Sequence, residues 1–172
     1  MLLDVDHSKI LLNAALETGL PVWVGLSCCD SKFDNSVIGR NFRAEKEKSL
    51  IYDENKYKDQ PKYLPEDKII LLEDIIKSLT SLGGDVYGIM HTWFQDSIGG
   101  LKILKNNWKG PIMFYPEIHK FDTNTHKAII TMTEEEFSNS ILELIDDQIQ
   151  IVGGCCGVND KHLKRLIQSI SE

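Results

Sequence analysis

The chain has 172 residues and a net charge of −7, from 19 basic and 26 acidic side chains. This length suits one domain, and its hydrophobic and charged fractions, 42% and 26%, exclude a wholly disordered chain. The acidic balance argues against a nucleic-acid partner, because such binders usually present a basic face. No apolar run approaches the ~20 residues of a membrane span, and the first six residues do not resemble a secretory signal, so we expect no membrane partner.

Apolar periodicity and glycine stops predict alternating helices and strands. In chain order we expect a helix over 10–18, a strand over 21–26, a helix over 66–82, a strand over 86–90, a helix over 97–106, a strand over 111–115, a helix over 133–146, a strand over 149–152 and a helix over 160–170. Thr133 and Glu136 have the spacing of a capping box. This order predicts an α/β fold with parallel pairing, either a barrel or a doubly wound sheet.

The segment from about 30 to 65 differs in composition from the rest of the chain. It is rich in Lys, Asp, Glu and Asn, with scattered aromatic residues. We interpret it as a long excursion that contains a short helix near 44–50. Loops of this length inside a compact domain are usually functional or mobile, so the excursion is expected to lie outside the alternating core.

The four cysteines form two adjacent pairs, Cys28-Cys29 and Cys155-Cys156. Neighbouring cysteines rarely bond each other because the resulting ring is strained, and four cysteines in this length are too few for a disulfide scaffold. With no export signal, we expect the cytoplasm, a reducing compartment. There, thiolate chemistry or metal binding is favoured over crosslinking.

Three of the predicted strands end in residues that can bind a metal ion. These ends are Ser27-Cys28-Cys29-Asp30, His91 and Gly153-Gly154-Cys155-Cys156-Gly157, whereas the strand over 111–115 is followed by Pro116-Glu117 with His119 nearby. In both candidate architectures, functional sites form at the carboxyl ends of the strands. A shared site at one end of the sheet is therefore expected.

The cysteine pair between glycines is the most specific of these features. Strand alternation would send adjacent thiolates to opposite faces, so both can bind one ion only where the backbone turns, and the glycines permit that turn. A catalytic zinc keeps three protein ligands and one open position, which leaves one partner to be found: His91, or Cys28 or Cys29. For Cys28-Cys29 the simpler interpretation is a pair of small buried hydrophobes.

Four segments in this order resemble the homocysteine S-methyltransferase family: GLPVWVG at 19–25, GIMH at 88–91, GPIMFYP at 110–116 and VGGCCG at 152–157. The similarity spans nearly the whole chain and is weakest over 31–63. The resemblance implies a (β/α)8 TIM barrel with a catalytic zinc. On this mapping the four strands look like strands five to eight, and residues 1–172 are a partial homocysteine-binding barrel domain, its C-terminal half.

The same resemblance implies a Zn²⁺ site. Cys155 and Cys156 match the vicinal cysteine ligands of the family, and His91 stands where the family usually has another cysteine. Imidazole is a good zinc ligand, so we expect His91, Cys155 and Cys156 to bind the ion, with no catalytic residue beyond these ligands. Weaker substrate-binding candidates near the same strand ends are Asp30, Tyr115, Glu117, Gly153 and Gly154.

The implied reaction is methyl transfer to the thiol of homocysteine, giving methionine, with the zinc-bound thiolate as nucleophile. A small methyl donor is the second partner: a sulfonium, betaine or a methylated cofactor. A complete barrel takes roughly 250 residues, so strands one to four are expected to be missing. A truncated reading frame, a complementary half-barrel chain and a homo-oligomer of half barrels stay open.

Two other functions compete with this interpretation. The first is a catalytically incomplete half barrel that binds zinc or thiols, or assembles with a partner chain, without turnover. The second is a redox protein that uses vicinal thiols, although neither pair has the Cys-x-x-Cys spacing of that class. Metal content separates the redox protein from the two zinc-dependent interpretations, and methyl transfer separates the enzyme from the incomplete half barrel.

Overall fold

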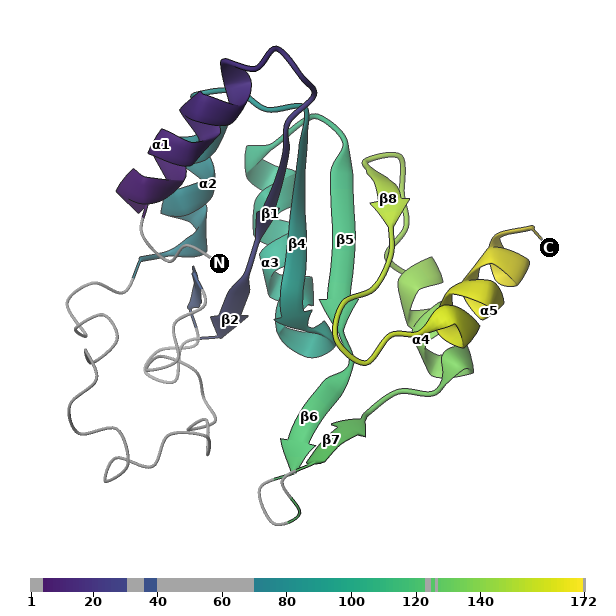
Figure 1. Cartoon of the computed structure of the whole chain (residues 1–172). Coiled ribbons are helices and arrows are strands. Elements are labelled where there is room, and N and C mark those ends of the chain that lie inside the picture. Colours follow the sequence, from purple (N-terminus) through teal and green to yellow (C-terminus); the bar gives the residue numbers. More distant parts are fainter. Residues whose placement is uncertain (1–4, 31–35, 40–69, 123–124, 126, 172) are drawn as a thin grey trace, which may run out of the picture.

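The computed structural model describes residues 5–30, 36–39, 70–122, 125 and 127–171. Its centre is a parallel sheet of four strands that lie side by side in the order in which they occur along the chain (Figure 1). These strands are β1 (Trp23–Leu26), β4 (Val86–Trp93), β5 (Ile112–Glu117) and β8 (Ile149–Val152). The predicted α/β alternation with parallel pairing is confirmed.

Each of the five predicted helices is present, with ends that differ from the predicted ones by up to six residues, and residues 66–69 of the second predicted helix lie outside the described part of the chain. They are α1 (Val5–Leu16), α2 (Leu72–Thr80), α3 (Phe94–Asn107), α4 (Glu134–Leu142) and α5 (Asp160–Ser171). The capping box is confirmed, because Glu136 N donates to Thr133 Oγ1 at 3.2 Å and Thr133 N donates to Glu136 Oε2 at 2.8 Å. The short helix expected over 44–50 lies outside the described residues.

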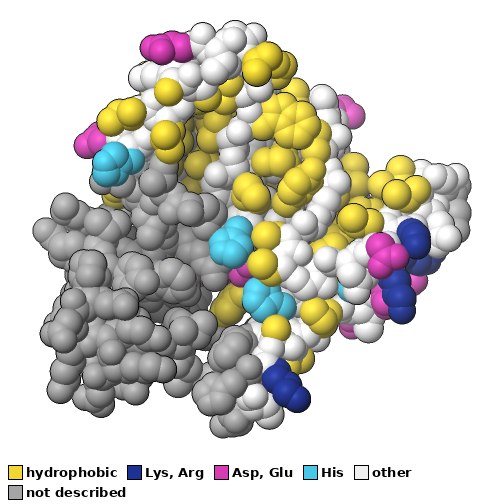
Figure 2. Space-filling model, viewed as in Figure 1, with side chains coloured by type: hydrophobic (Ala, Val, Ile, Leu, Met, Phe, Trp, Pro, Cys, Tyr) yellow, Lys and Arg dark blue, Asp and Glu magenta, His cyan; other side chains and the backbone are white. Residues whose placement is uncertain are grey.

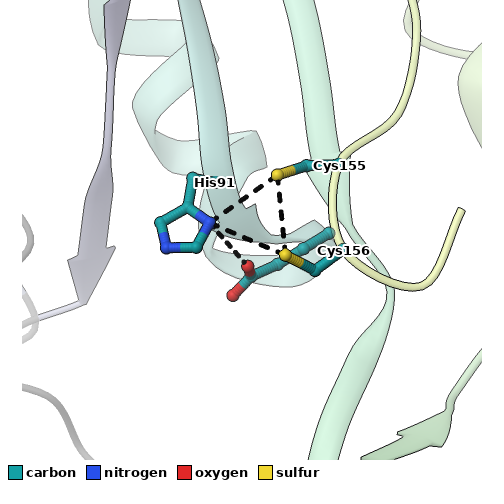
Figure 3. Close-up of side chains that lie close together, drawn as sticks. His91, Cys155 and Cys156 are labelled. Atoms are coloured by element: carbon teal, nitrogen blue, oxygen red, sulfur yellow. Dashed lines mark hydrogen bonds and ion pairs between the residues drawn. The ribbon is translucent and has the colours of Figure 1, made fainter. Parts of the chain in front are cut away.

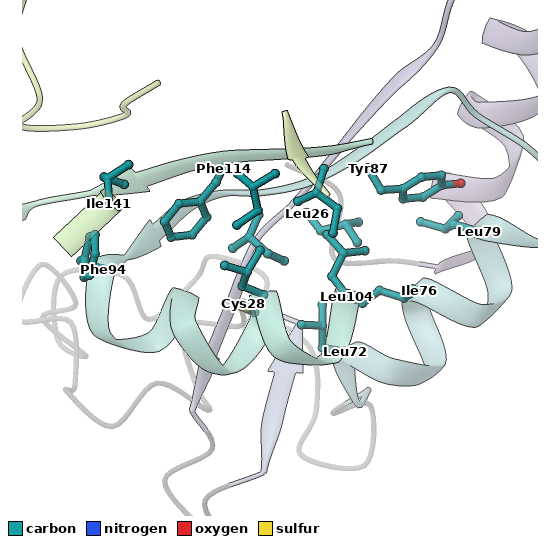
Figure 4. Close-up of a cluster of buried hydrophobic side chains, with 14 of the residues drawn as sticks. Leu26, Cys28, Leu72, Ile76, Leu79, Tyr87, Phe94, Leu104, Phe114 and Ile141 are labelled. Carbon is teal, nitrogen blue, oxygen red and sulfur yellow. The ribbon is translucent and has the colours of Figure 1, made fainter. Parts of the chain in front are cut away.

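The core lies between one face of the sheet and helices α2 and α3 (Figure 4). Alternate residues of the strands point into it, as the period of two requires. Its fully buried members include Tyr87, Ile89, Ile112 and Phe114 from the strands and Leu72, Ile76, Leu79 and Leu104 from the helices. Helices α4 and α5 pack against each other, and they add Phe137, Ile141 and Leu166 to the same core.

The opposite face of the sheet is not covered by any described helix, and in Figure 2 hydrophobic side chains gather over it. Gly88 pairs with Met113 in the β4–β5 ladder, and a Cβ on Gly25 would collide with Met90, so the glycines make room for these two methionines. Trp23, at the start of β1, is 54% exposed. In the described part of the chain the sheet is open, with β1 and β8 as its edge strands.

Two antiparallel hairpins were not predicted. One pairs β2 (Cys28–Asp30) with β3 (Val37–Gly39), and the other pairs β6 (His119–Asp122) with β7 (Lys127–Ile130). Strands of three or four residues are too short to show a clear alternation of apolar and polar residues, so sequence periodicity could not reveal them. Residues 28–30, which we expected to end the first strand, instead form a strand of their own. Among the described residues, no helix has the length and apolarity needed to span a membrane.

Candidate metal centre

The site begins with a β-bulge near the carboxyl end of β4. Met90 pairs with Tyr115 and Trp93 pairs with Glu117, so three steps along β4 match two along β5. Within the bulge, His91 has φ +49°, a left-handed conformation that is uncommon for a residue with a Cβ. An extra residue of this kind re-aims a side chain that strict alternation would send elsewhere. The bulge therefore determines where the imidazole of His91 points.

Hydrogen bonds from the end of β1 hold this bulge. Ser27 Oγ donates to the carbonyl oxygen of His91 at 2.6 Å. The hydroxyl of Thr92, which is fully buried, donates to the carbonyl of Met90 at 3.0 Å and accepts from Cys28 N at 3.0 Å. Residues flanking His91 are thus tied to the neighbouring strand, which is how a structure maintains a sparsely populated backbone conformation.

The cysteine pair lies in a turn just after β8, and this turn is bonded to the end of β5. Cys155 N donates to the carbonyl of Pro116 at 3.0 Å, and Ile118 N donates to the carbonyl of Cys156 at 2.9 Å. Gly157 closes the turn with φ +91°, where a side chain would be strained. The predicted departure from strand alternation is therefore present, and both sulfur atoms lie on the same side.

The two thiols converge on the imidazole of His91 (Figure 3). Cys155 Sγ and Cys156 Sγ lie 3.6 and 3.9 Å from His91 Nδ1, and the two sulfur atoms are 3.8 Å apart. A fourth donor joins them: Glu117 Oε2 lies 3.3 Å from His91 Nδ1. The four donor atoms are all within 4.8 Å of one another. Residues from β4, β5 and the turn after β8 therefore form one cluster.

These separations fit a zinc ion. With bond lengths near 2.3 Å to sulfur and 2.0–2.1 Å to nitrogen, a tetrahedral ion holds two sulfur ligands about 3.8 Å apart and a sulfur and a nitrogen about 3.6 Å apart. The observed separations are 3.8 Å between the sulfurs and 3.6 and 3.9 Å from sulfur to nitrogen. Two thiols and an imidazole are also the donor types that zinc prefers. The residues present fit zinc as they stand.

The electrostatics of the cluster also favour a cation. Partial burial raises the pKa of the Cys156 thiol, and the neighbouring Cys155 and Glu117 raise the same pKa further. All of these effects oppose a second negative charge at this position. A divalent cation among the donors would reverse them, because it stabilises the thiolate directly.

The other predicted residues have different positions. Tyr115 packs its ring on Gly153, beside the cysteine turn, and Gly154 lies against Val158. Asp30 lies in β2 and is not among the four clustered donors. The substrate-binding roles suggested for these residues stay predictions. For Glu117 we expected only a weak substrate contact. Its sequence signal as a possible metal donor is a carboxylate directly after a predicted strand.

Cys28 and Cys29 do not join the cluster. Both are buried in β2, and Cys28 packs so closely on Gly100 of α3 that a Cβ there would collide with its sulfur. This contact also explains why α3 carries a glycine in its second turn despite the cost in helix propensity. Neither cysteine lies among the clustered donors, and their burial agrees with the interpretation of the pair as small buried hydrophobes.

Cys28 should react far more slowly with alkylating reagents than Cys156. Burial raises the pKa of Cys28 to about 12, so at pH 8 only about 1 in 10⁴ of its thiols is ionised, and the thiolate is the reactive form. We expect iodoacetamide to modify Cys28 in the native, metal-free protein at least about 100-fold more slowly than exposed Cys156. Peptide mass spectrometry measures both rates, and the same reaction in urea is the control. Equal native rates would contradict the assigned burial.

Comparison with known proteins agrees with this geometry. The family model described as homocysteine S-methyltransferase matches residues 71–170, a segment that includes all four clustered donors. No curated protein matches the chain. The family match covers more than half of the 172 residues, and it runs from α2 through α5. The chain therefore belongs to the homocysteine S-methyltransferase family.

Proposed function

We propose that this protein transfers a methyl group to the thiol of homocysteine, giving methionine, with a zinc ion held by His91, Cys155 and Cys156. The observation that carries the proposal is the convergence of two thiols and an imidazole, at separations that suit zinc, in a chain of this family. A sulfonium compound, betaine or a methylated cofactor would supply the methyl group. In the reaction the sulfur–carbon bond forms as the bond between the donor and its methyl carbon breaks, and that electron pair leaves with the donor.

The chain's own residues would bind and orient the substrate. A zinc ion bound here would supply positive charge that keeps a substrate thiol ionised at neutral pH. The bulge in β4 fixes His91, and the hydrogen bonds between the Cys155-Cys156 turn and the end of β5 hold the two cysteines in place. The ring of Tyr115 lies next to the cysteine turn, where it can limit the access of water to the sulfur.

We further propose that residues 1–172 form one domain, equivalent to strands five to eight of a (β/α)8 barrel, with a long excursion at about 30–65. Two observations support this: the strands pair in chain order, and the sheet face opposite the core carries exposed apolar side chains such as Trp23. In a closed barrel, the face opposite the helices lines the interior. A complementary half, either a second copy or another chain, would cover it. The four cysteines, none in a disulfide, suit a reducing compartment such as the cytoplasm.

A second candidate function is a half barrel that binds zinc or thiols, or assembles with a partner, without turnover. The exposure of Trp23 at 54% favours it, because the apolar face beside the site is open in the described part of the chain. An open face admits water to the sulfur atoms, and the strands that are expected to be missing would carry much of the contact to the amino-acid end of homocysteine. Where this candidate binds zinc, it uses the same three metal ligands and differs only in catalysis.

The test is metal content followed by methyl transfer. We expect the purified, reduced chain to contain about one zinc ion, and to form methionine from homocysteine and one of the three donor types. A chelator-treated sample, reloaded with zinc, is the control for metal dependence. Zinc without methionine for any donor would contradict the enzyme and favour the non-catalytic half barrel. A folded chain without zinc would contradict the enzyme and leave a half barrel that assembles with a partner chain.

A further inference from the structure

We infer that the ring of Trp93 binds the cationic head of the methyl donor, so that the donor is a small organic cation, either a sulfonium or a quaternary ammonium compound. This inference rests on the proposed function and deepens it, because three donor types are open there. The first support is a contact within the chain. Lys120 Nζ lies over the ring of Trp93, 5.7 Å from its centroid. The negative face of an indole attracts an ammonium group at this distance, so the ring already holds a cation.

The second support is the position of Trp93 beside the metal centre. Trp93 is the last residue of β4, two residues after His91, and it pairs directly with Glu117 of β5. Residues directly opposite one another in a ladder lie on the same face of a sheet, and Glu117 is one of the four clustered donors. The half-buried side chain of Trp93 is therefore on the face that carries the cluster. A ligand bound on its ring would adjoin the metal centre.

The third support is the charge of the centre. The side chain of Glu117 is only 1% exposed, so water screens its carboxylate little. With zinc and substrate bound, the two cysteine thiolates and the substrate thiolate would outweigh the charge of the divalent ion and leave the site negative. This charge attracts a cationic donor and repels an anionic one.

The contact with Trp93 would also distinguish the donor from its product. In the transfer, the substrate sulfur forms a bond to the methyl carbon while the bond from that carbon to the sulfonium sulfur or ammonium nitrogen breaks. The electron pair of the broken bond stays on the leaving atom, which becomes an uncharged thioether or tertiary amine. The attraction between the ring and a positive charge is then lost, so the spent donor is held less tightly than the fresh one.

Lys120 would hold the place of the donor until the donor arrives. It belongs to β6, which continues beyond the end of β5 toward the hairpin with β7 (Figure 1), and its side chain is exposed. A lysine side chain regains rotamer freedom when it leaves a fixed position, so an incoming cation can displace its ammonium group at a small cost. Lys120 thus acts as an internal competitor for the ring of Trp93.

The experiment compares ligands that share a shape but differ in charge. Betaine carries a trimethylammonium group where 3,3-dimethylbutyrate carries a tert-butyl group, and dimethylsulfonioacetate and 3-methylbutyrate form the corresponding sulfonium pair. Each ligand is titrated into the zinc-loaded full chain without homocysteine, so that no transfer occurs. Calorimetry gives the affinities, and we expect each cation to bind about 10-fold more tightly than its uncharged counterpart. Proton NMR should show the methyl signals of the bound cations shifted upfield by the indole ring.

Substitutions of Trp93 test whether its ring is the source of this preference. In Trp93→Leu the ratio of the two affinities should fall to about 2-fold and the upfield shift should disappear, whereas Trp93→Phe keeps an aromatic face and should retain most of both. Trp23→Leu is the matched control. Trp23 lies at the start of β1, away from the strand ends that form the cluster, and is 54% exposed. This control should leave the ratio and the shift unchanged.

A substitution of Lys120 tests the competition. Tetramethylammonium is the probe, because it has no carboxylate that could bind lysine. In Lys120→Gln the competing ammonium group is absent, so tetramethylammonium should bind about 3-fold more tightly than to the wild type. Weaker binding to this variant would overturn the exchange between Lys120 and the donor.

The outcomes separate this inference from the proposed function. Equal affinities within both ligand pairs, or a ratio that Trp93→Leu leaves unchanged, would overturn the inference. A preference within one pair alone supports it and identifies the donor class. Methionine formed only with a methylated cofactor would overturn the inference while the proposed function stands. A cation preference that depends on Trp93, in a chain that forms no methionine with any donor, would contradict the proposed function and leave a cation site.

Discussion

Serine at either position of the cysteine pair will remove zinc from the protein. Cys155→Ser and Cys156→Ser each replace a thiolate with a hydroxyl, which stays protonated at neutral pH and is a poor zinc ligand. We expect the zinc affinity to fall at least about 1,000-fold, or about 4 kcal/mol, because even outer-shell changes at such sites cost 10–100-fold. Competition with a chelator measures the affinity, and metal analysis of the purified variants gives the stoichiometry.

The matched control is the same substitution in the other cysteine pair. Cys28 is buried against Gly100 and lies outside the cluster, so Cys28→Ser should retain about one zinc ion. This variant should be less stable, because a hydroxyl replaces a buried thiol. Loss of zinc from a folded Cys28→Ser variant, with Cys155→Ser unaffected, would show that the ion binds elsewhere.

His91→Gly should separate metal binding from stability. The variant loses a ligand, so we expect its zinc affinity to fall by about 1,000-fold or more. Its metal-free form, however, should not lose stability. A residue with a Cβ in the left-handed region costs roughly 1–2 kcal/mol, and His91 has φ +49° there, whereas glycine adopts this conformation freely. The entropy of glycine in the unfolded chain and the lost contact between His91 Nδ1 and the buried Glu117 Oε2 offset part of the gain, which leaves a change in the free energy of unfolding between zero and about +1 kcal/mol.

Urea unfolding of the chelator-treated proteins measures this effect. Gln150→Gly is the control, because Gln150 is exposed in β8 and its φ is not positive. That substitution should cost roughly 0.5–1 kcal/mol, the usual cost of glycine within a strand. If His91→Gly destabilises the metal-free protein as much as Gln150→Gly does, the backbone at His91 is not strained, and the bulge has another cause.

The regular elements could be predicted because their signals are local. The apolar stripe of α2 and the capping box of Thr133 and Glu136 lie within single turns of helix, and each strand of the main sheet is a short apolar run. The predicted ends of the helices and strands were less accurate. Helix α3 begins at Phe94, directly after β4, although we expected it to begin three residues later. The short hairpins were missed because strands of three or four residues carry too little pattern to read.

The site was predictable to the extent that it depends on strand ends. Because parallel strands bring their carboxyl ends together, His91 and the cysteine pair could be expected to meet. The left-handed backbone of His91 could not be predicted, since it arises from a register shift between two strands that are joined through helix α3. The depth of Glu117 depends on the same packing, so its side chain was assigned a minor role.

A zinc ion held by the cysteine turn and by His91 would also link distant parts of the chain. His91 and Cys155 are 64 residues apart in the sequence, so only the folded chain presents the whole ligand set. Zinc would then act as a reversible crosslink whose strength depends on its free concentration. The folded state would gain about 1.4 kcal/mol for each tenfold rise in free zinc above the dissociation constant. The lifetime of this protein in a cell would thus follow the zinc supply, through the balance between folding and degradation.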